Sequence, residues 1–119
     1  MREKVLVTGG AGFIGARLCE KLLRLGYEVH IYDLIPIDQA KRLQKIIKDK
    51  NLFYTQGDLR NKDDIKSWYL KDATTLYHLA SVVGVENYIN DPLALIDIVI
   101  GGTRYLLELA TKFNTRVLN

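Results

Sequence analysis

The stretch VTGGAGFIGARL, residues 7–18, decides the fold because it joins a β-branched apolar run to a helical pattern through four glycines. The apolar run Lys4–Thr8 predicts a strand, and the apolar spacing over residues 13–25 predicts a helix. The residues expected to share the buried face of that helix are Ile14, Leu18, Leu22 and Leu25.

Strand and helix patterns alternate along the rest of the chain. Further strands are predicted at residues 28–33, 51–58, 73–79 and 115–119. Strands that alternate with helices at this spacing form a parallel sheet covered on both faces. The right-handed crossover rule favours the order 3-2-1-4-5. The predicted fold class is therefore α/β, a Rossmann-type doubly wound parallel sheet that stops before its sixth strand.

Three more helices are predicted between these strands. Asp38 is expected to cap a helix that runs to about Asp49. A short helix is expected to start at Asn61, and Asp91 with Pro92 opens a long one. The residues expected to point inward from the helix at 38–49 are Ala40, Leu43 and Ile47.

Composition excludes several classes of protein. The chain of 119 residues is the size of one domain, and its net charge of +3 is spread along it. Nucleic-acid binding is therefore not expected. The single cysteine, Cys19, cannot form an internal disulfide, which fits a reducing compartment. No apolar run is long enough to span a membrane and no Cys/His spacing suggests a metal site. We expect a cytoplasmic protein without membrane or nucleic-acid partners.

The glycine spacing predicts a binding site for a diphosphate. A helix N-terminus offers unpaired N–H groups and the positive end of the helix dipole. Gly9 would permit the tight turn, Gly12 the close approach of the phosphates, and Gly15 the close packing of helix on strand. The string G-x-x-x-x-G-K-[ST] of nucleoside-triphosphate sites does not occur. The alternative is a merely structural turn.

Asp33 predicts which dinucleotide binds. It ends the second predicted strand, 18 positions after Gly15, where a carboxylate can accept hydrogen bonds from the ribose hydroxyls of adenosine. A 2′-phosphate would meet like charge there, and Leu34 and Ile35 supply no cation to offset it. NAD is therefore expected rather than NADP. The alternative is that Asp33 is a polar residue at the end of a strand.

At this point the sequence resembles a known family. The segments VTGGAGFIG, YDL, GDLRN and YHLAS resemble, in order, signatures of the extended short-chain dehydrogenase/reductase proteins. More narrowly they resemble the NAD-dependent epimerases and dehydratases that act on nucleotide sugars. The resemblance extends over essentially the whole chain. It implies that residues 1–119 are an NAD-binding Rossmann domain and the N-terminal portion of a longer enzyme.

The resemblance also implies residue roles. Phe13 and Ile14 would donate N–H groups to the pyrophosphate, and Asp58 would accept from the adenine amino group. Val83, Gly84 and Val85 would contact the substrate. The full set of implied cofactor contacts is Gly9, Gly12, Phe13, Ile14, Gly15, Asp33, Leu34, Asp58, Leu59, Leu79, Ala80 and Ser81.

Four positions have interpretations that do not involve the cofactor directly. His78, within a predicted strand, is expected to be a packed core histidine. Val99 stands where family members commonly carry an Asn that orders the polar network near the active site. The adjacent Gly101 and Gly102 cost about 1 kcal/mol each within a helix. Either close packing against the sheet compensates for them or the helix kinks there.

The acid–base residues of the family are missing from this sequence. Hydride chemistry there uses a Tyr with a Lys four residues later, and none of the seven tyrosines has one. The leading hypothesis is the NAD-binding part of a nucleotide-sugar epimerase or dehydratase that is catalytically incompetent by itself. The alternative is a non-catalytic dinucleotide-sensing or interaction module. A homodimer is possible, including one formed through the open edge of the sheet.

Overall fold

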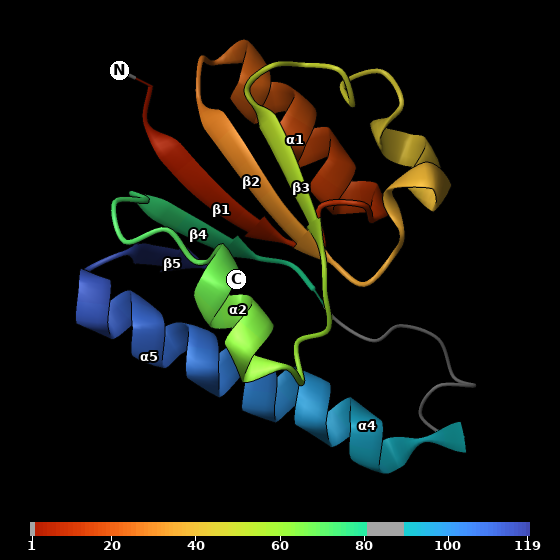
Figure 1. Ribbon diagram of the computed structural model, residues 1–119, viewed down its shortest axis with the longest axis vertical. Coiled ribbons are helices and arrows are strands. Elements are labelled where there is room, and N and C mark those ends of the chain that lie inside the picture. The colour runs from red at the N-terminus through yellow and green to blue at the C-terminus, as the bar shows by residue number, and fades with distance from the viewer. Residues whose placement is uncertain (1, 81–89) are drawn as a thin grey trace.

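The computed structural model describes residues 2–80 and 90–119. Within them lies a five-stranded parallel sheet in the order β3-β2-β1-β4-β5, as predicted (Figure 1). Its register aligns Val7 of β1 with Ile31 on one side and Tyr77 on the other. The strands are β1 Lys4–Thr8, β2 Glu28–Asp33, β3 Leu52–Gln56, β4 Thr75–His78 and β5 Arg116–Leu118.

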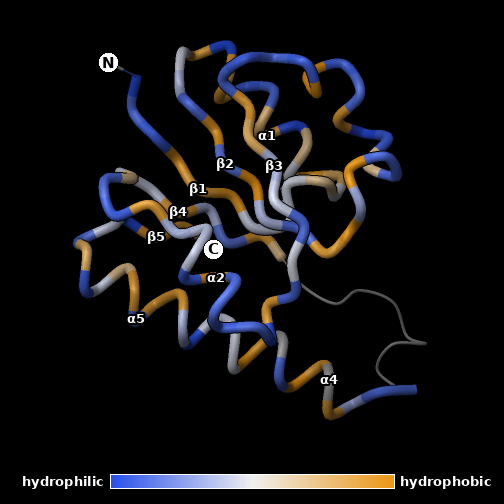
Figure 2. Tube along the Cα trace, in the orientation of Figure 1, coloured by the Kyte–Doolittle hydropathy of each residue, from blue (hydrophilic) through white to orange (hydrophobic). Residues whose placement is uncertain are grey.

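Helices cover both faces of the sheet, and each face has its own core. Val5 and Val7 of β1 belong to one buried cluster, which includes side chains of helix α1, Phe13–Arg24. Leu6, between them, points the other way, into a cluster with α2, Lys62–Trp68, and α5, Thr103–Phe113. Figure 2 shows hydrophobic residues concentrated in the strands between these layers.

The prediction for the buried face of α1 was partly wrong. Ile14 and Leu25 are 68% and 62% exposed, whereas Gly15, Ala16, Cys19 and Leu22 are buried. A side chain at Gly15 would collide with the carbonyl oxygen of Gly9, so the helix meets the glycine loop through its smallest residues. This close approach fixes the rotation of the helix and leaves Ile14 on the outside.

The helix predicted at 38–49 does not form. Two 3₁₀ turns, Ile37–Gln39 and Lys41–Leu43, stand in its place, and Asp38 lies inside the first rather than capping a helix. Backbone hydrogen bonds along this segment, such as Leu43 N–H to Ala40 and Ile46 N–H to Leu43, reach back three residues. That period puts residues 40, 43 and 46 on one face. Ala40 and Leu43 are buried as predicted.

The short helix α2 begins where the sequence predicts. The Asn61 side-chain oxygen accepts from the Asp64 N–H at 3.1 Å, which satisfies one of the free donors of the first turn. Ile65 and Trp68 of α2 are buried against the sheet. This cap fixes the point at which the chain leaves the loop after β3.

The long predicted helix forms with an irregular middle. Helix α4, Pro92–Ile96, continues through a π-helical segment, Asp97–Gly102, into α5. A Cβ on Gly102 would lie 2.8 Å from the Cβ of Leu59, whereas one on Gly101 would meet nothing within 4 Å. Close packing therefore explains one glycine, although the contact is with the loop after β3 and not with a strand.

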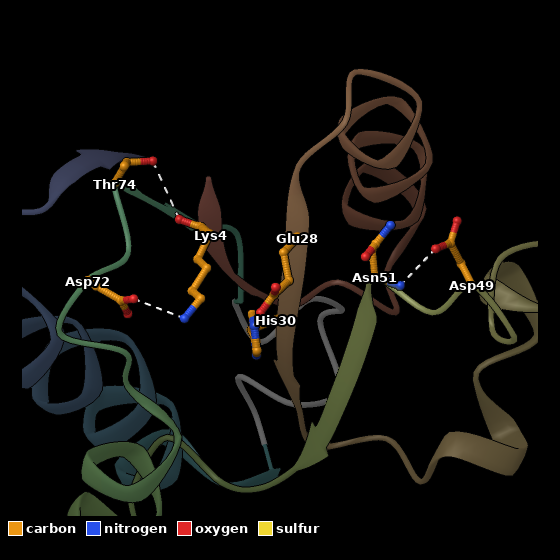
Figure 3. A network of polar contacts seen from close by, with 7 residues as sticks. All are labelled: Lys4, Glu28, His30, Asp49, Asn51, Asp72 and Thr74. Carbon is orange, nitrogen blue, oxygen red and sulfur yellow. Dashed lines mark hydrogen bonds and ion pairs between the residues drawn. The ribbon is translucent and has the colours of Figure 1, made fainter. Parts of the chain in front are cut away.

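The amino ends of the strands carry a polar network (Figure 3). Lys4 Nζ lies 2.9 Å from Asp72 Oδ2, and the imidazole of His30 lies 2.6 Å from Glu28 Oε1. The Asn51 N–H donates to Asp49 Oδ1 at 2.9 Å. These contacts pair Lys4 with Asp72 and His30 with Glu28 at that end of the sheet.

Candidate functional site

A cavity of about 600 Å³ opens at the carboxyl ends of the strands. Segments that follow β1, β2, β3 and β4 all contribute to its wall. Ligands of open α/β sheets bind outside these strand ends. Most of the predicted cofactor contacts lie on this wall. They are Gly9, Gly12, Phe13, Ile14, Gly15, Asp33, Leu34, Asp58, Leu59, Leu79 and Ala80.

The glycine loop is held firmly by the ends of neighbouring strands. Gly9 has φ of +73°, which favours glycine, and its N–H donates to the Tyr32 carbonyl at 3.0 Å. A Cβ there would also lie 2.7 Å from the Ala80 nitrogen. At Gly15 an added Cβ would come within 2.2 Å of the Gly9 oxygen. The loop is therefore tightly packed between α1 and the segment that follows β4.

Gly12 differs from these two glycines because its side-chain position is open. The nearest atom to an added Cβ is the Gly9 oxygen at 3.4 Å, an ordinary contact. Gly12 is the N-cap of α1, and this end of the helix has neither a side-chain cap nor an acidic residue in its first turn. The first N–H groups of α1 therefore have no side-chain cap, and the residues that carry them line the cavity. That arrangement suits an anion.

Asp33 is fixed on the same wall by two backbone donors. Its Oδ2 accepts from the Ala11 N–H and its Oδ1 from the Ile35 N–H, both at 3.0 Å. Each carboxylate oxygen keeps a lone pair for a further donor, such as a ribose hydroxyl. Tyr54 donates to the Ile35 carbonyl at 2.5 Å. Burial, and secondarily the charge of Asp33, raise the pKa of Tyr54, so the phenol stays a donor.

The loop after β3 forms the next part of the wall. Tyr32 donates its hydroxyl to the Asp58 carbonyl at 2.8 Å, and Gly57 lies so close to the Tyr32 ring that a Cβ would collide with it. The Asp58 carboxylate lies 2.7 Å from a guanidinium nitrogen of Arg60, whose hydrogen bond lowers the pKa of Asp58.

A buried polar chain supports the end of β4. Thr8 Oγ1 accepts from the Ala80 N–H at 3.1 Å and lies 2.6 Å from His78 Nδ1. His78 Nε2 lies 2.7 Å from Thr103 Oγ1 at the start of α5. A neutral imidazole satisfies both contacts, with one ring nitrogen donating to a threonine hydroxyl and the other accepting from one. Burial lowers the pKa of His78 and keeps the ring neutral. His78 is thus packed in the core, as expected.

Five residues of the cavity wall were not among the predicted contacts: Ala11, Tyr32, Ile35, Arg42 and Gly57. Tyr32 and Gly57 directly precede predicted contacts, and their adjacency was a usable signal. Arg42 gave no signal, because its place on the wall depends on the 3₁₀ turns that replace the predicted helix. Ser81, Val83, Gly84 and Val85 lie outside the described residues. Val99, in the π-helical segment, is 42% exposed.

No helix within the described residues is long and apolar enough to cross a membrane.

The model of a family described as GDP-mannose 4,6 dehydratase matches residues 6–118. The bifunctional UDP-glucose 4-epimerase and UDP-xylose 4-epimerase 1 of Pisum sativum is 34% identical over 121 residues. That match covers 96% of this chain and 35% of the relative. UDP-glucuronic acid decarboxylase 1 of Danio rerio is 32% identical, over 98% of this chain and 27% of that protein.

The chain is also similar to solved structures of a nucleotide-sugar epimerase and a dehydratase. The UDP-glucose 4-epimerase of Thermus thermophilus in complex with NAD superposes with a TM-score of 0.77 at 29% identity, over 94% of this chain and 35% of that one. The dTDP-glucose 4,6-dehydratase DesIV of Streptomyces venezuelae, with NAD and TYD bound, gives 0.82 at 28% identity, over 96% and 38%. The chain therefore spans only part of the length of the proteins it matches, 35% in the case of the Pisum sativum epimerase.

Proposed function

Because the chain belongs to the GDP-mannose 4,6 dehydratase family, we propose that residues 1–119 form the NAD-binding domain of a nucleotide-sugar epimerase or dehydratase. One observation carries the proposal. The uncapped N-terminus of α1, with open space at Gly12, shares a cavity with the fixed carboxylate of Asp33. A diphosphate and a ribose diol need these two groups on one wall.

The residues present fit the dinucleotide along its length. The N–H groups of Phe13 and Ile14 would hold the diphosphate, and Asp33 would accept from the adenosine ribose hydroxyls. Asp58 would face the adenine amino group. Leu59 and Leu34 would flank the adenosine. Leu79, Ala80 and Ser81 would line the nicotinamide side, where the Thr8–Ala80 hydrogen bond holds the backbone in place.

When bound, NAD would supply hydride transfer from the sugar and back to the same or a rearranged sugar in the longer enzyme. This chain would bind and orient the cofactor. Val83, Gly84 and Val85 would contact the nucleotide sugar. None of the seven tyrosines precedes a lysine by four residues. We therefore expect these 119 residues alone to bind NAD without turning over a nucleotide sugar.

The proposal extends to assembly and location. β5 is the outer strand of the sheet beside β4, and its Arg116 and Leu118 are exposed. Within the described residues no further strand pairs with that edge of β5, which suits pairing with a second copy of the chain in a homodimer. Sedimentation of the wild-type chain tests this directly, and a monomer at all concentrations would contradict it. The expected location is the cytoplasm.

Calorimetric titration of NAD and NADP into the chain tests the function. Wild type is expected to bind NAD more tightly, and Asp33→Ala to lose most of that preference. Asp38→Ala is the matched control, because Asp38 is an exposed aspartate in the next turn that does not line the cavity. Equal or reversed affinity for the two dinucleotides in wild type would contradict the assignment of Asp33.

A further inference from the structure

The charges on the cavity wall are unevenly paired. Two acidic residues, Asp33 and Asp58, line it, and both carboxylates already accept hydrogen bonds from the protein. One basic residue, Arg42, lines it as well. Among residues 2–80 and 90–119, no ion pair joins Arg42 to a carboxylate. Arg42 is therefore the wall's one cation without an anionic partner in the described part of the chain.

The position of this cation is defined by a contact with the start of α1. The guanidinium carbon of Arg42 lies 5.9 Å from the centroid of the Phe13 ring, a cation–π arrangement. Phe13 is the first residue of α1. Leu43, the next residue after Arg42, is fully buried in the same core cluster as Ala16 of α1. The buried neighbour anchors the 3₁₀ turn, and the contact with the Phe13 ring places the guanidinium near the first residue of α1.

We propose that Arg42 is a direct ligand of the dinucleotide's diphosphate, acting beside the N–H groups at the start of α1. This inference rests on the proposed function. A diphosphate bridge carries two negative charges, whereas a helix N-terminus offers the equivalent of only about half a positive charge. A planar guanidinium can donate two parallel hydrogen bonds to phosphate oxygens. The cation–π contact with Phe13 restricts the Arg42 side chain beforehand, so less conformational entropy is lost on binding.

A series of ligands distinguishes this role from others. Adenosine, ADP, NAD and NADP are titrated into wild type, Arg42→Gln, Arg42→Lys and Lys41→Gln. Lys41 is the matched control, because it is an exposed cation in the same turn that does not line the cavity. Arg42→Gln is expected to weaken ADP and NAD about tenfold, as for loss of a partly exposed charge-assisted hydrogen bond. The adenosine affinity and the thermal unfolding midpoint of Arg42→Gln should match those of Lys41→Gln.

Two further results belong to the prediction. Arg42→Lys should lie between wild type and Arg42→Gln, since it keeps the charge and loses the planar fork. In a double-mutant cycle with Phe13→Leu, the effect of Arg42→Gln on ADP should shrink, because the ring no longer orders the guanidinium. Additive effects would overturn the role given to Phe13 stacking.

The outcomes separate this inference from the proposed function. If wild type binds NAD and Arg42→Gln binds ADP and NAD equally well, the inference fails while the function stands. A loss confined to NADP would mean that Arg42 contacts a 2′-phosphate, which also overturns it. An equal loss of adenosine affinity in Arg42→Gln would reveal a structural effect of the substitution and would also overturn the inference. Absence of NAD binding by wild type would overturn the proposed function and this inference together.

Discussion

The glycine loop at residues 9–15 and the glycine pair of the long helix, Gly101 and Gly102, differ in what surrounds the glycine that has open space beside it. The loop contains three glycines that the protein crowds, Gly9, Gly10 and Gly15, and one that it leaves open, Gly12. The helix pair contains one of each kind, the crowded Gly102 and the open Gly101. The open space at Gly12 is a cavity wall beside uncapped helix N–H groups. Gly101 is simply exposed on the surface. An uncrowded glycine therefore points to a ligand only where polar groups without partners surround it.

The largest effect on stability is expected for Gly15→Ala. Its Cβ would lie 2.2 Å from the Gly9 oxygen, and backbone would have to move on one side or the other. Such overpacking should lower the free energy of unfolding by about 3 kcal/mol. Urea denaturation followed by circular dichroism measures it. A variant as stable as wild type would mean that the loop is not pressed against α1.

The buried chain that joins β1, β4 and α5 gives a pH dependence. The pKa of His78 is lower in the folded chain than its ordinary value of 6.5, because burial disfavours the charged ring. The unfolded chain therefore binds a proton first as the pH falls. Stability should be fully present above pH 6.5 and decline below it as the pH approaches the folded pKa, by at most about 1.4 kcal/mol per pH unit.

The measurement for His78 is the difference between wild type and His78→Gln in the pH dependence of unfolding. Subtracting the variant removes the contribution of every other titratable group, because those groups are the same in both proteins. A difference that grows as the pH rises through the window supports the neutral, doubly hydrogen-bonded ring. A difference that grows as the pH falls would mean that the imidazolium is the native form.

A smaller loss is expected for Gly102→Ala. The new Cβ would lie 2.8 Å from Leu59 Cβ and 3.0 Å from the Leu59 oxygen. The clash is offset in part by the better helix propensity of alanine, leaving a net loss of about 1 kcal/mol. Thermal unfolding monitored by circular dichroism should show a lowered midpoint. A raised midpoint would contradict close packing of this segment on the loop after β3.

The smallest effect, with the opposite sign, is expected for Gly101→Ala. A Cβ there meets no atom within 4 Å. The substitution should raise the free energy of unfolding by about 0.5–1 kcal/mol through helix propensity and a less flexible unfolded chain. The same thermal experiment measures it. Destabilisation would show that the π-helical segment itself requires glycine at this position.

The sheet order was predictable because strand and helix patterns alternate and crossovers have one hand. The placement of Gly9, Gly12 and Asp33 on one wall followed from the same topology. The failures come from close contacts that periodicity does not encode. Gly15 pressing on Gly9 rotates α1 and exposes Ile14.

The segment after β2 shows the same limit. Its apolar residues at 40, 43 and 46 suit a period of three, while 40, 43 and 47 suit an α-helix, so the sequence allowed both. Packing of Leu43 against α1 accompanies the 3₁₀ turns and puts Arg42 on the cavity wall. No local motif in the sequence carried that information.

Titration of NAD into Gly12→Val, with Gly101→Ala as the folded control, tests the central claim most directly. The account predicts that Gly12→Val keeps a circular dichroism spectrum like that of wild type and loses NAD binding at least about 100-fold, because the side chain fills the space beside the α1 N–H groups. Binding of NAD by a folded Gly12→Val chain with wild-type affinity would contradict it.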